Sequence, residues 1–177
     1  MIISTEIWIK KGYEIFALEG FKSLKIESLS KKVGISKSSF YHHFSDMDVF
    51  VELLMQYHLE QAHIIAKKEH HAKNVEPELI NILTEHKIDL LFNRQLRINR
   101  VHKNYADTLI QSDIIIGNVF AMAWVKDLNL KLNQLQLEGI FELVMENFYL
   151  QINLENLNHT WLANYFTNLK RIAGYFV

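Results

Sequence analysis

The sequence predicts an all-α protein, and three observations support this fold class. The chain of 177 residues contains six Gly and one Pro, too few turn-forming residues for a β-sandwich or a barrel. Apolar residues make up 49% and charged residues 22%, which is typical of a folded globular chain. Apolar side chains recur at spacings of three and four residues, the period of amphipathic helices.

Composition also limits the function. The chain has no Cys, which excludes a disulfide, a thiolate metal site and a thiol nucleophile. Its net charge is −1, so nucleic-acid binding would need a local basic patch. Residues 1–12 do not form a signal peptide, and the most apolar stretch, 114–125, is shorter than the about 20 residues of a membrane-spanning helix. We expect a cytoplasmic protein that binds no membrane.

The N-terminal third predicts four helices. A first helix carries Ile9, Tyr13 and Phe16 on one stripe and ends at Gly20, since glycine readily takes the backbone conformation that follows a helix. Ser36 is an expected N-cap of the third helix, and Ser45 or Asp46 of the fourth. The second, third and fourth helices are expected at about 25–33, 37–43 and 47–68.

The rest of the chain predicts four or five further helices. The polar segment 70–77, which holds the only proline, separates them from the fourth helix. We divide the chain into a helix-turn-helix domain over 1–46 and a helical domain over 47–177, with the helix 47–68 connecting the two. The further helices are expected at about 77–93, 95–105, 107–128, 134–154 and 158–174.

The segment 25–44 carries the functional signal. Two short helices joined by a turn that contains Gly34 form the helix-turn-helix pattern. In this motif the second helix enters the DNA major groove and presents small or polar side chains to base edges. Lys37, Ser38 and Ser39 are such residues, and Tyr41 offers a hydroxyl to the DNA backbone.

Local charge agrees with DNA binding. Between Gly20 and Ser45 five lysines stand against the single acidic residue Glu27, a local charge of about +4 in a chain of −1. His42 and His43 add positive charge where nearby phosphates raise their pKa.

At this point the sequence resembles the tetracycline-repressor (TetR/AcrR) family of bacterial regulators. The resemblance rests on the run from Ile9 to Gly20, on Val33-Gly34-Ile35-Ser36 and above all on Phe40-Tyr41-His42-His43-Phe44. It implies a three-helix helix-turn-helix domain followed by a helical ligand-binding and dimerisation domain. It also implies a homodimeric transcription regulator, without enzymatic activity or cofactor, that binds a double-stranded DNA operator and a small-molecule effector. A ligand-released repressor is expected, with DNA contacts from Lys25, Ser36, Lys37, Ser38, Ser39, Tyr41, His42 and His43.

One departure from the family pattern leaves an alternative open. Members usually carry a phosphate-binding lysine three positions after the closing Phe, where this chain has Met47 between Asp46 and Asp48. Two carboxylates there would repel phosphate. The alternative is a helical ligand-binding or enzyme-like protein whose helix-turn-helix no longer binds DNA.

The second domain carries less specific signals. The resemblance implies an effector cavity among its central helices, for which the candidates are His86, Phe92, Tyr105, Phe120 and Trp124. The last two predicted helices carry apolar groups on more than one face, which indicates a second buried surface. The resemblance implies that this surface is a four-helix dimer interface, with candidates Phe141, Val144, Phe148, Trp161, Tyr165, Phe166 and Leu169.

Two other patterns were weighed. Glu60 and His63 form a single Glu-x-x-His, and without a second copy we expect no metal site. Arg94, Arg97, Arg100 and Lys103 recur every three residues. A solvated basic face is the simpler interpretation of this stripe, and recognition of an anionic ligand or an acidic partner protein is the alternative.

Overall fold

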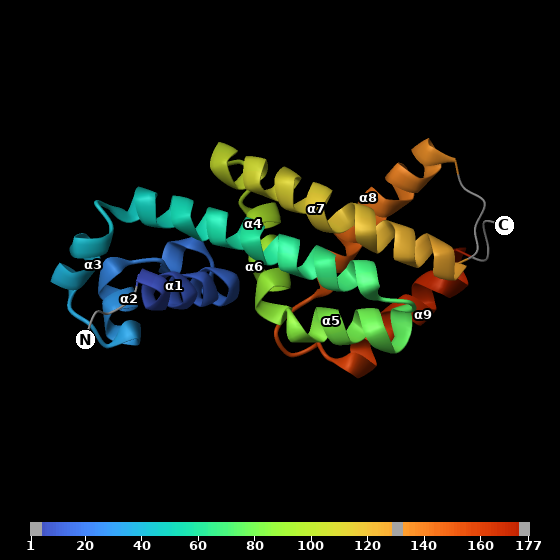
Figure 1. Ribbon diagram of the computed structural model, residues 1–177, viewed down its shortest axis with the longest axis horizontal. Coiled ribbons are helices and arrows are strands. Elements are labelled where there is room, and N and C mark those ends of the chain that lie inside the picture. Colours follow the sequence, from blue (N-terminus) through green and yellow to red (C-terminus); the bar gives the residue numbers. More distant parts are fainter. Residues whose placement is uncertain (1–4, 129–132, 174–177) are drawn as a thin grey trace.

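The computed structural model describes residues 5–128 and 133–173, and within these ranges it contains helices and no strand (Figure 1). The all-α prediction is therefore confirmed. The α-helices are α1 (Thr5–Glu19), α2 (Ile26–Val33), α3 (Lys37–His43), α4 (Met47–His71), α5 (Ile80–Glu85), α6 (Lys87–Ile98), α7 (Lys103–Leu128), α8 (Gln134–Gln151) and α9 (His159–Ala173). No helix of the described ranges is long and apolar enough to cross a membrane.

The short N-terminal helices gather at one end of an elongated molecule. The long helix α4 leads away from them, and α7 lies along it (Figure 1). The two most extensive helix pairings are α4 with α7 and α1 with α6. The first helix of the predicted DNA-binding domain thus packs directly on a helix of the second domain.

One continuous hydrophobic core runs through both predicted domains. Tyr13 stacks on Phe92 of α6 with ring centroids 4.2 Å apart, and Phe16 lies 4.4 Å from the same ring. Phe16 and Phe92 are both fully buried. The division at residue 46 stays a prediction, because α1 packs both on α2, which precedes residue 46, and on α6, which follows it.

The helix boundaries near the N-terminus agree with the prediction. The observed α2 and α3 reproduce the expected pair, and Gly34 ends α2 with φ 77°, ψ 25°. This left-handed conformation is one that L side chains rarely adopt. Gly20 ends α1 with φ 79°.

The predicted breaks near residues 94 and 106 are wrong, because α6 and α7 run through them. The chain turns instead at His86 and over 99–102. Asn93, at the end of the expected helix 77–93, lies inside α6, where it is buried and donates to the Ser112 hydroxyl of α7 at 3.0 Å. A polar side chain with a partner inside the core does not end a helix.

Candidate functional site

Local chemistry shapes the α2–α3 turn. The Ser36 hydroxyl accepts a hydrogen bond from the Ser39 amide at 3.3 Å and caps α3. Such a cap satisfies an amide that the helix itself leaves without a partner. The turn and the cap together fix the direction in which α3 leaves α2.

Two aromatic side chains anchor α3. Phe40 and Phe44, one helical turn apart, are 0% and 2% exposed. The Phe40 ring lies 5.6 Å from Trp8 of α1 and 5.3 Å from Phe50 of α4. This aromatic cluster holds α3 against both helices, so α3 can present only its other face to a partner.

That other face carries the polar residues named from the sequence. Lys37, Ser38 and His42 are exposed, and Tyr41 is 57% exposed. Because 37 and 41, like 38 and 42, are four residues apart, these side chains lie on adjacent rows of one helix surface. The structure thus brings them together on one exposed face.

The other predicted DNA contacts lie at its margins. Lys25 and Ser36 are exposed at the N-caps of α2 and α3. Ser39 and His43 are half-buried. His43 Nδ1 lies 3.2 Å from the Thr5 hydroxyl of α1, which ties this ring to the first helix.

Part of the local positive charge is already paired. Lys37 donates to Glu27 at 2.5 Å, and Lys32 pairs with Glu19. The side-chain hydrogen bond from Lys37 lowers the pKa of Glu27. Both ion pairs are exposed, and exposed pairs contribute little stability. Lys37 can therefore leave Glu27 for a phosphate at small cost.

The acidic residues at the start of α4 have a structural explanation. The Asp46 carboxylate accepts from the Val49 amide at 2.9 Å and caps α4. Met47 packs against the core, and Asp48 lies in the first turn, where negative charge suits the helix dipole. One of the two carboxylates is thus committed to capping.

The predicted effector residues do not gather around one cavity in the described part of the chain. Phe92 is enclosed by rings, with His58 stacked 4.6 Å away on the side of α4. Tyr105 contacts Phe16 and Phe21 of the N-terminal segment. The side chains of Phe120 and Trp124 lie outside the part that the structure describes.

His86, in the turn between α5 and α6, belongs to a chain of polar contacts that connects α1, α4 and α6. His86 Nδ1 lies 2.8 Å from one oxygen of Asp89, and its Nε2 lies 2.9 Å from Lys68 Nζ. The Tyr13 hydroxyl donates to the other Asp89 oxygen at 2.9 Å and lies 2.7 Å from His58 Nδ1. The pattern of apolar residues did not predict these contacts, whose members come from α1, α4, α6 and the turn between α5 and α6.

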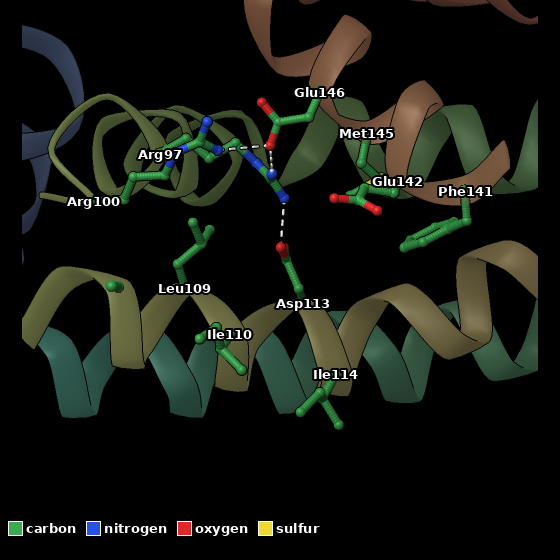
Figure 2. A pocket seen from close by; sticks show the side chains of 11 residues that line it. Arg97, Arg100, Leu109, Ile110, Asp113, Ile114, Phe141, Glu142, Met145 and Glu146 are labelled. Carbon is green, nitrogen blue, oxygen red and sulfur yellow. Dashed lines mark hydrogen bonds and ion pairs between the residues drawn. The ribbon is translucent and has the colours of Figure 1, made fainter. Parts of the chain in front are cut away.

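Two members of the basic stripe, Arg94 and Arg97, are half-buried, whereas Arg100 and Lys103 are exposed to solvent. Arg97 pairs with Asp113 of α7 and Glu146 of α8, each at 2.5 Å (Figure 2). Arg100 reaches the same Glu146 oxygen at 2.9 Å. Arg94 donates to the backbone oxygen of Tyr149 at 3.2 Å. These arginines tie α6 to α7 and α8.

A groove opens beside Arg97, with a volume of about 490 Å³. Its walls come from α6, α7 and α8 (Figure 2). The sequence analysis missed this site. A signal was available, because Glu138, Glu142 and Glu146 recur every four residues and so lie along one face of this helix. Its lining residues are Arg97, Arg100, Ala106, Leu109, Ile110, Asp113, Ile114, Phe141, Glu142, Met145 and Glu146.

The predicted dimer residues are mostly packed within the chain. Val144, Phe148, Tyr165 and Phe166 are buried, while Phe141, Trp161 and Leu169 are half-buried. Tyr165 also donates to the Val144 backbone oxygen at 3.3 Å. Burial of the first group therefore needs no second subunit, and the interface stays a prediction. The large apolar residues that α8 exposes are Leu135, Leu143 and Leu150, at 74–79%.

Three comparisons with known proteins agree with this architecture. Residues 9–54 match the family model for bacterial regulatory proteins of the tetR family. The uncharacterized HTH-type transcriptional regulator YerO of Bacillus subtilis (strain 168) is 26% identical over 110 residues, which is 62% of this chain and 36% of YerO. This chain thus matches only about a third of that relative's length.

A solved structure has the same fold over almost the whole chain. It is a protein from Rhodococcus sp. that is described as a TetR-family transcriptional regulator, with a TM-score of 0.58 at 17% identity. The similarity covers 93% of this chain and 97% of that one. Residues 9–54, which include α2 and α3, therefore match the model of the tetR family of bacterial regulatory proteins, and the chain as a whole shares its fold with the Rhodococcus protein.

Proposed function

We propose that this protein is a sequence-specific DNA-binding regulator that acts as a dimer and leaves its operator when a small molecule binds. One observation carries the proposal. The helix α3 is anchored by Phe40 and Phe44, and it exposes Lys37, Ser38 and Tyr41 on its opposite side. A helix that is buried on one side and polar on the other fits the major groove, where side chains reach base edges and phosphates.

The alternative, a helix-turn-helix that has lost DNA binding, drew its support from the carboxylates beside Met47. The cap formed by Asp46 weakens that support, because its carboxylate is occupied by the Val49 amide. A capping residue is needed wherever α4 begins, whether or not DNA is present. The position of Asp46 is thus compatible with both functions, and DNA binding is favoured by α3.

A selection experiment tests the proposal. The purified protein is offered a random duplex library at about 50 and 200 mM salt, and the bound duplexes are sequenced. We expect an inverted repeat whose half-sites are one helical turn or a multiple of it apart, with binding that weakens steeply at the higher salt because lysines displace phosphate counterions. Failure to enrich any motif at low salt would count against DNA binding.

Matched variants then test the role of α3. Lys37→Ala should weaken binding clearly and Tyr41→Phe by less, whereas Lys67→Ala should have no effect because Lys67 lies exposed near the far end of α4. Glu27→Gln should tighten binding by up to about fivefold, since it removes an exposed ion pair of at most about 1 kcal/mol. If Lys37→Ala, Tyr41→Phe and Glu27→Gln all bind DNA as tightly as the wild type does, α3 does not face the DNA.

The dimer part is tested by sedimentation at micromolar concentration. A two-fold dimer would present two copies of α3 to successive major grooves, about 34 Å apart. Leu143, 74% exposed on α8, is a large apolar residue that a partner subunit would cover. We expect a dimer that Leu143→Glu weakens. A monomeric wild type would contradict this part of the proposal.

A further inference from the structure

We propose that the groove between α6, α7 and α8 binds a small amphipathic molecule that carries a protonated amine. Asp113 and Glu142 would hold the amine, and the apolar walls would hold the body of the molecule. That this ligand acts as the effector rests on the proposed function, whereas its binding does not.

The walls of the groove suit an apolar body. Leu109, Ile110 and Ile114 of α7 line the groove together with Phe141 and Met145 of α8, and Leu109 points into it (Figure 2). Ile110 and Ile114 are 57% and 61% exposed, so a bound molecule would remove apolar surface from water. The volume of about 490 Å³ lies in the range of sites for small ligands.

The charges of the groove favour a cation. Three carboxylates, from Asp113, Glu142 and Glu146, face the two guanidinium groups of Arg97 and Arg100. Both guanidinium groups already bind Glu146, and Arg97 also binds the Oδ2 atom of Asp113. An anionic molecule would therefore meet an excess of negative charge, and no arginine of the groove is without a carboxylate.

Two acceptors remain for a ligand. The Oδ1 atom of Asp113 is buried and has no hydrogen-bond partner, a state that costs free energy until a donor arrives. Burial raises the pKa of this carboxyl, although the ion pair with Arg97 lowers it. The Glu142 carboxylate points into the groove beside Met145 (Figure 2), and among the described residues it forms no ion pair.

An ammonium group matches these acceptors. It carries positive charge and three N–H donors, enough for both carboxylates. The Arg97 side chain is only 10% exposed and pairs with both Asp113 and Glu146 where it lines the groove. The structure therefore combines a rigid charged end with an apolar floor, which is the arrangement that an alkyl or aryl amine requires.

Calorimetric titration of the full-length protein tests the proposal with three probes of one chain length: octylamine, octan-1-ol and octanoate. We expect one octylamine per chain and binding of octanoate at least about tenfold weaker, since a hydrogen bond to a charged group is replaced by repulsion. Glu142→Gln and Asp113→Asn should each weaken octylamine about tenfold and leave octan-1-ol unchanged.

The control is Asp107→Asn, an exposed position six residues earlier on α7 that pairs with Lys103. It should bind octylamine as the wild type does. Octanoate binding as tight as octylamine, or octylamine binding that neither Glu142→Gln nor Asp113→Asn weakens, would overturn the proposal. Glu142 is exposed, so its variant gives a result even if Asp113→Asn fails to fold.

A second titration separates this inference from the proposed function. Octylamine is added to the complex with a selected duplex, and the DNA affinity is measured. Weaker DNA binding supports the effector role, while unchanged DNA binding overturns it and leaves the amine site standing. If no duplex is ever selected, the proposed function fails, but the direct titration still decides whether the groove binds amines.

Discussion

Replacing Tyr13 by Phe should destabilise the protein far more than the loss of one oxygen atom suggests. The Tyr13 hydroxyl donates to Asp89 at 2.9 Å and lies 2.7 Å from His58 Nδ1. Burial raises the pKa of Tyr13 well above its usual value, so this hydroxyl keeps its proton as a donor. Since that single proton is directed to Asp89, His58 Nδ1 must carry the hydrogen and donate to the Tyr13 oxygen.

The magnitude follows from the burial of these partners. Burial lowers the pKa of His58 to about 4, so the ring is neutral near pH 7 and carries one N–H. Tyr13→Phe leaves this N–H without an acceptor at a site that is 1% exposed, and it removes a donor from the Asp89 carboxylate. A buried unsatisfied donor costs roughly 1–3 kcal/mol, and a hydrogen bond to a charged group contributes roughly 1.5–3 kcal/mol. Because the two terms overlap, we expect a loss of roughly 2–4 kcal/mol.

Urea unfolding at pH 7, followed by circular dichroism, measures this loss. The matched control is Tyr57→Phe. The Tyr57 ring packs edge-on against Tyr13 at 4.9 Å, but its half-buried side chain takes no part in the polar chain. We expect the control to change the free energy of unfolding by less than about 0.5 kcal/mol.

Equal urea midpoints for Tyr13→Phe and Tyr57→Phe would contradict this prediction, because they would mean that the Tyr13 hydroxyl does not stabilise the fold. A changed m-value for Tyr13→Phe would point instead to an altered unfolded or native state, since m follows the surface exposed on unfolding.

The remaining predictions concern close packing and one buried carboxyl. Gly12→Ala should destabilise by about 1–3 kcal/mol in spite of the better helix former, because the new Cβ would lie 2.4 Å from the buried Phe50 ring. Gly139→Ala, where nothing lies within 4 Å, should stabilise α8 by up to about 1 kcal/mol; urea unfolding of both variants checks the opposite signs. Burial raises the pKa of Glu69 from 4.5 to about 8. Between these two pH values the native state holds a proton that the unfolded state has lost. The free energy of unfolding therefore falls by up to about 1.4 kcal/mol for each unit by which the pH rises. Glu69→Gln should therefore gain stability relative to the wild type as pH is raised from 5 to 8, and a difference that does not change with pH would contradict this.

The helix-turn-helix could be predicted because its signals are local. Gly34, Ser36 and the spacing of Phe40 and Phe44 each act within one or two helical turns, through backbone conformation, capping and helical period. The family resemblance over the same segment added the expected function of its exposed face. Such signals need no knowledge of distant segments.

The second domain was predicted less well, because its polar residues find partners far along the chain. Arg97 binds groups 16 and 49 residues away. From the sequence alone, an arginine at every third residue indicates a solvated stripe. The sequence does not show that Asp113 and Glu146 are the partners of Arg97. Asn93 likewise finds its partner inside the core, since it donates to the Ser112 hydroxyl 19 residues away.

By itself, the sequence determined the helical class, the boundaries of the second and third helices and most of the residues that α3 exposes. Helical period, glycine turns and caps depend only on neighbours within a few residues, so they can be identified from the sequence. Only the tertiary structure decided that α1 is joined to α6 through Tyr13 and Asp89, and that α6, α7 and α8 enclose a groove with an unpaired Asp113 oxygen. These features depend on which helices pack together, and that choice is made by the free energy of the whole core.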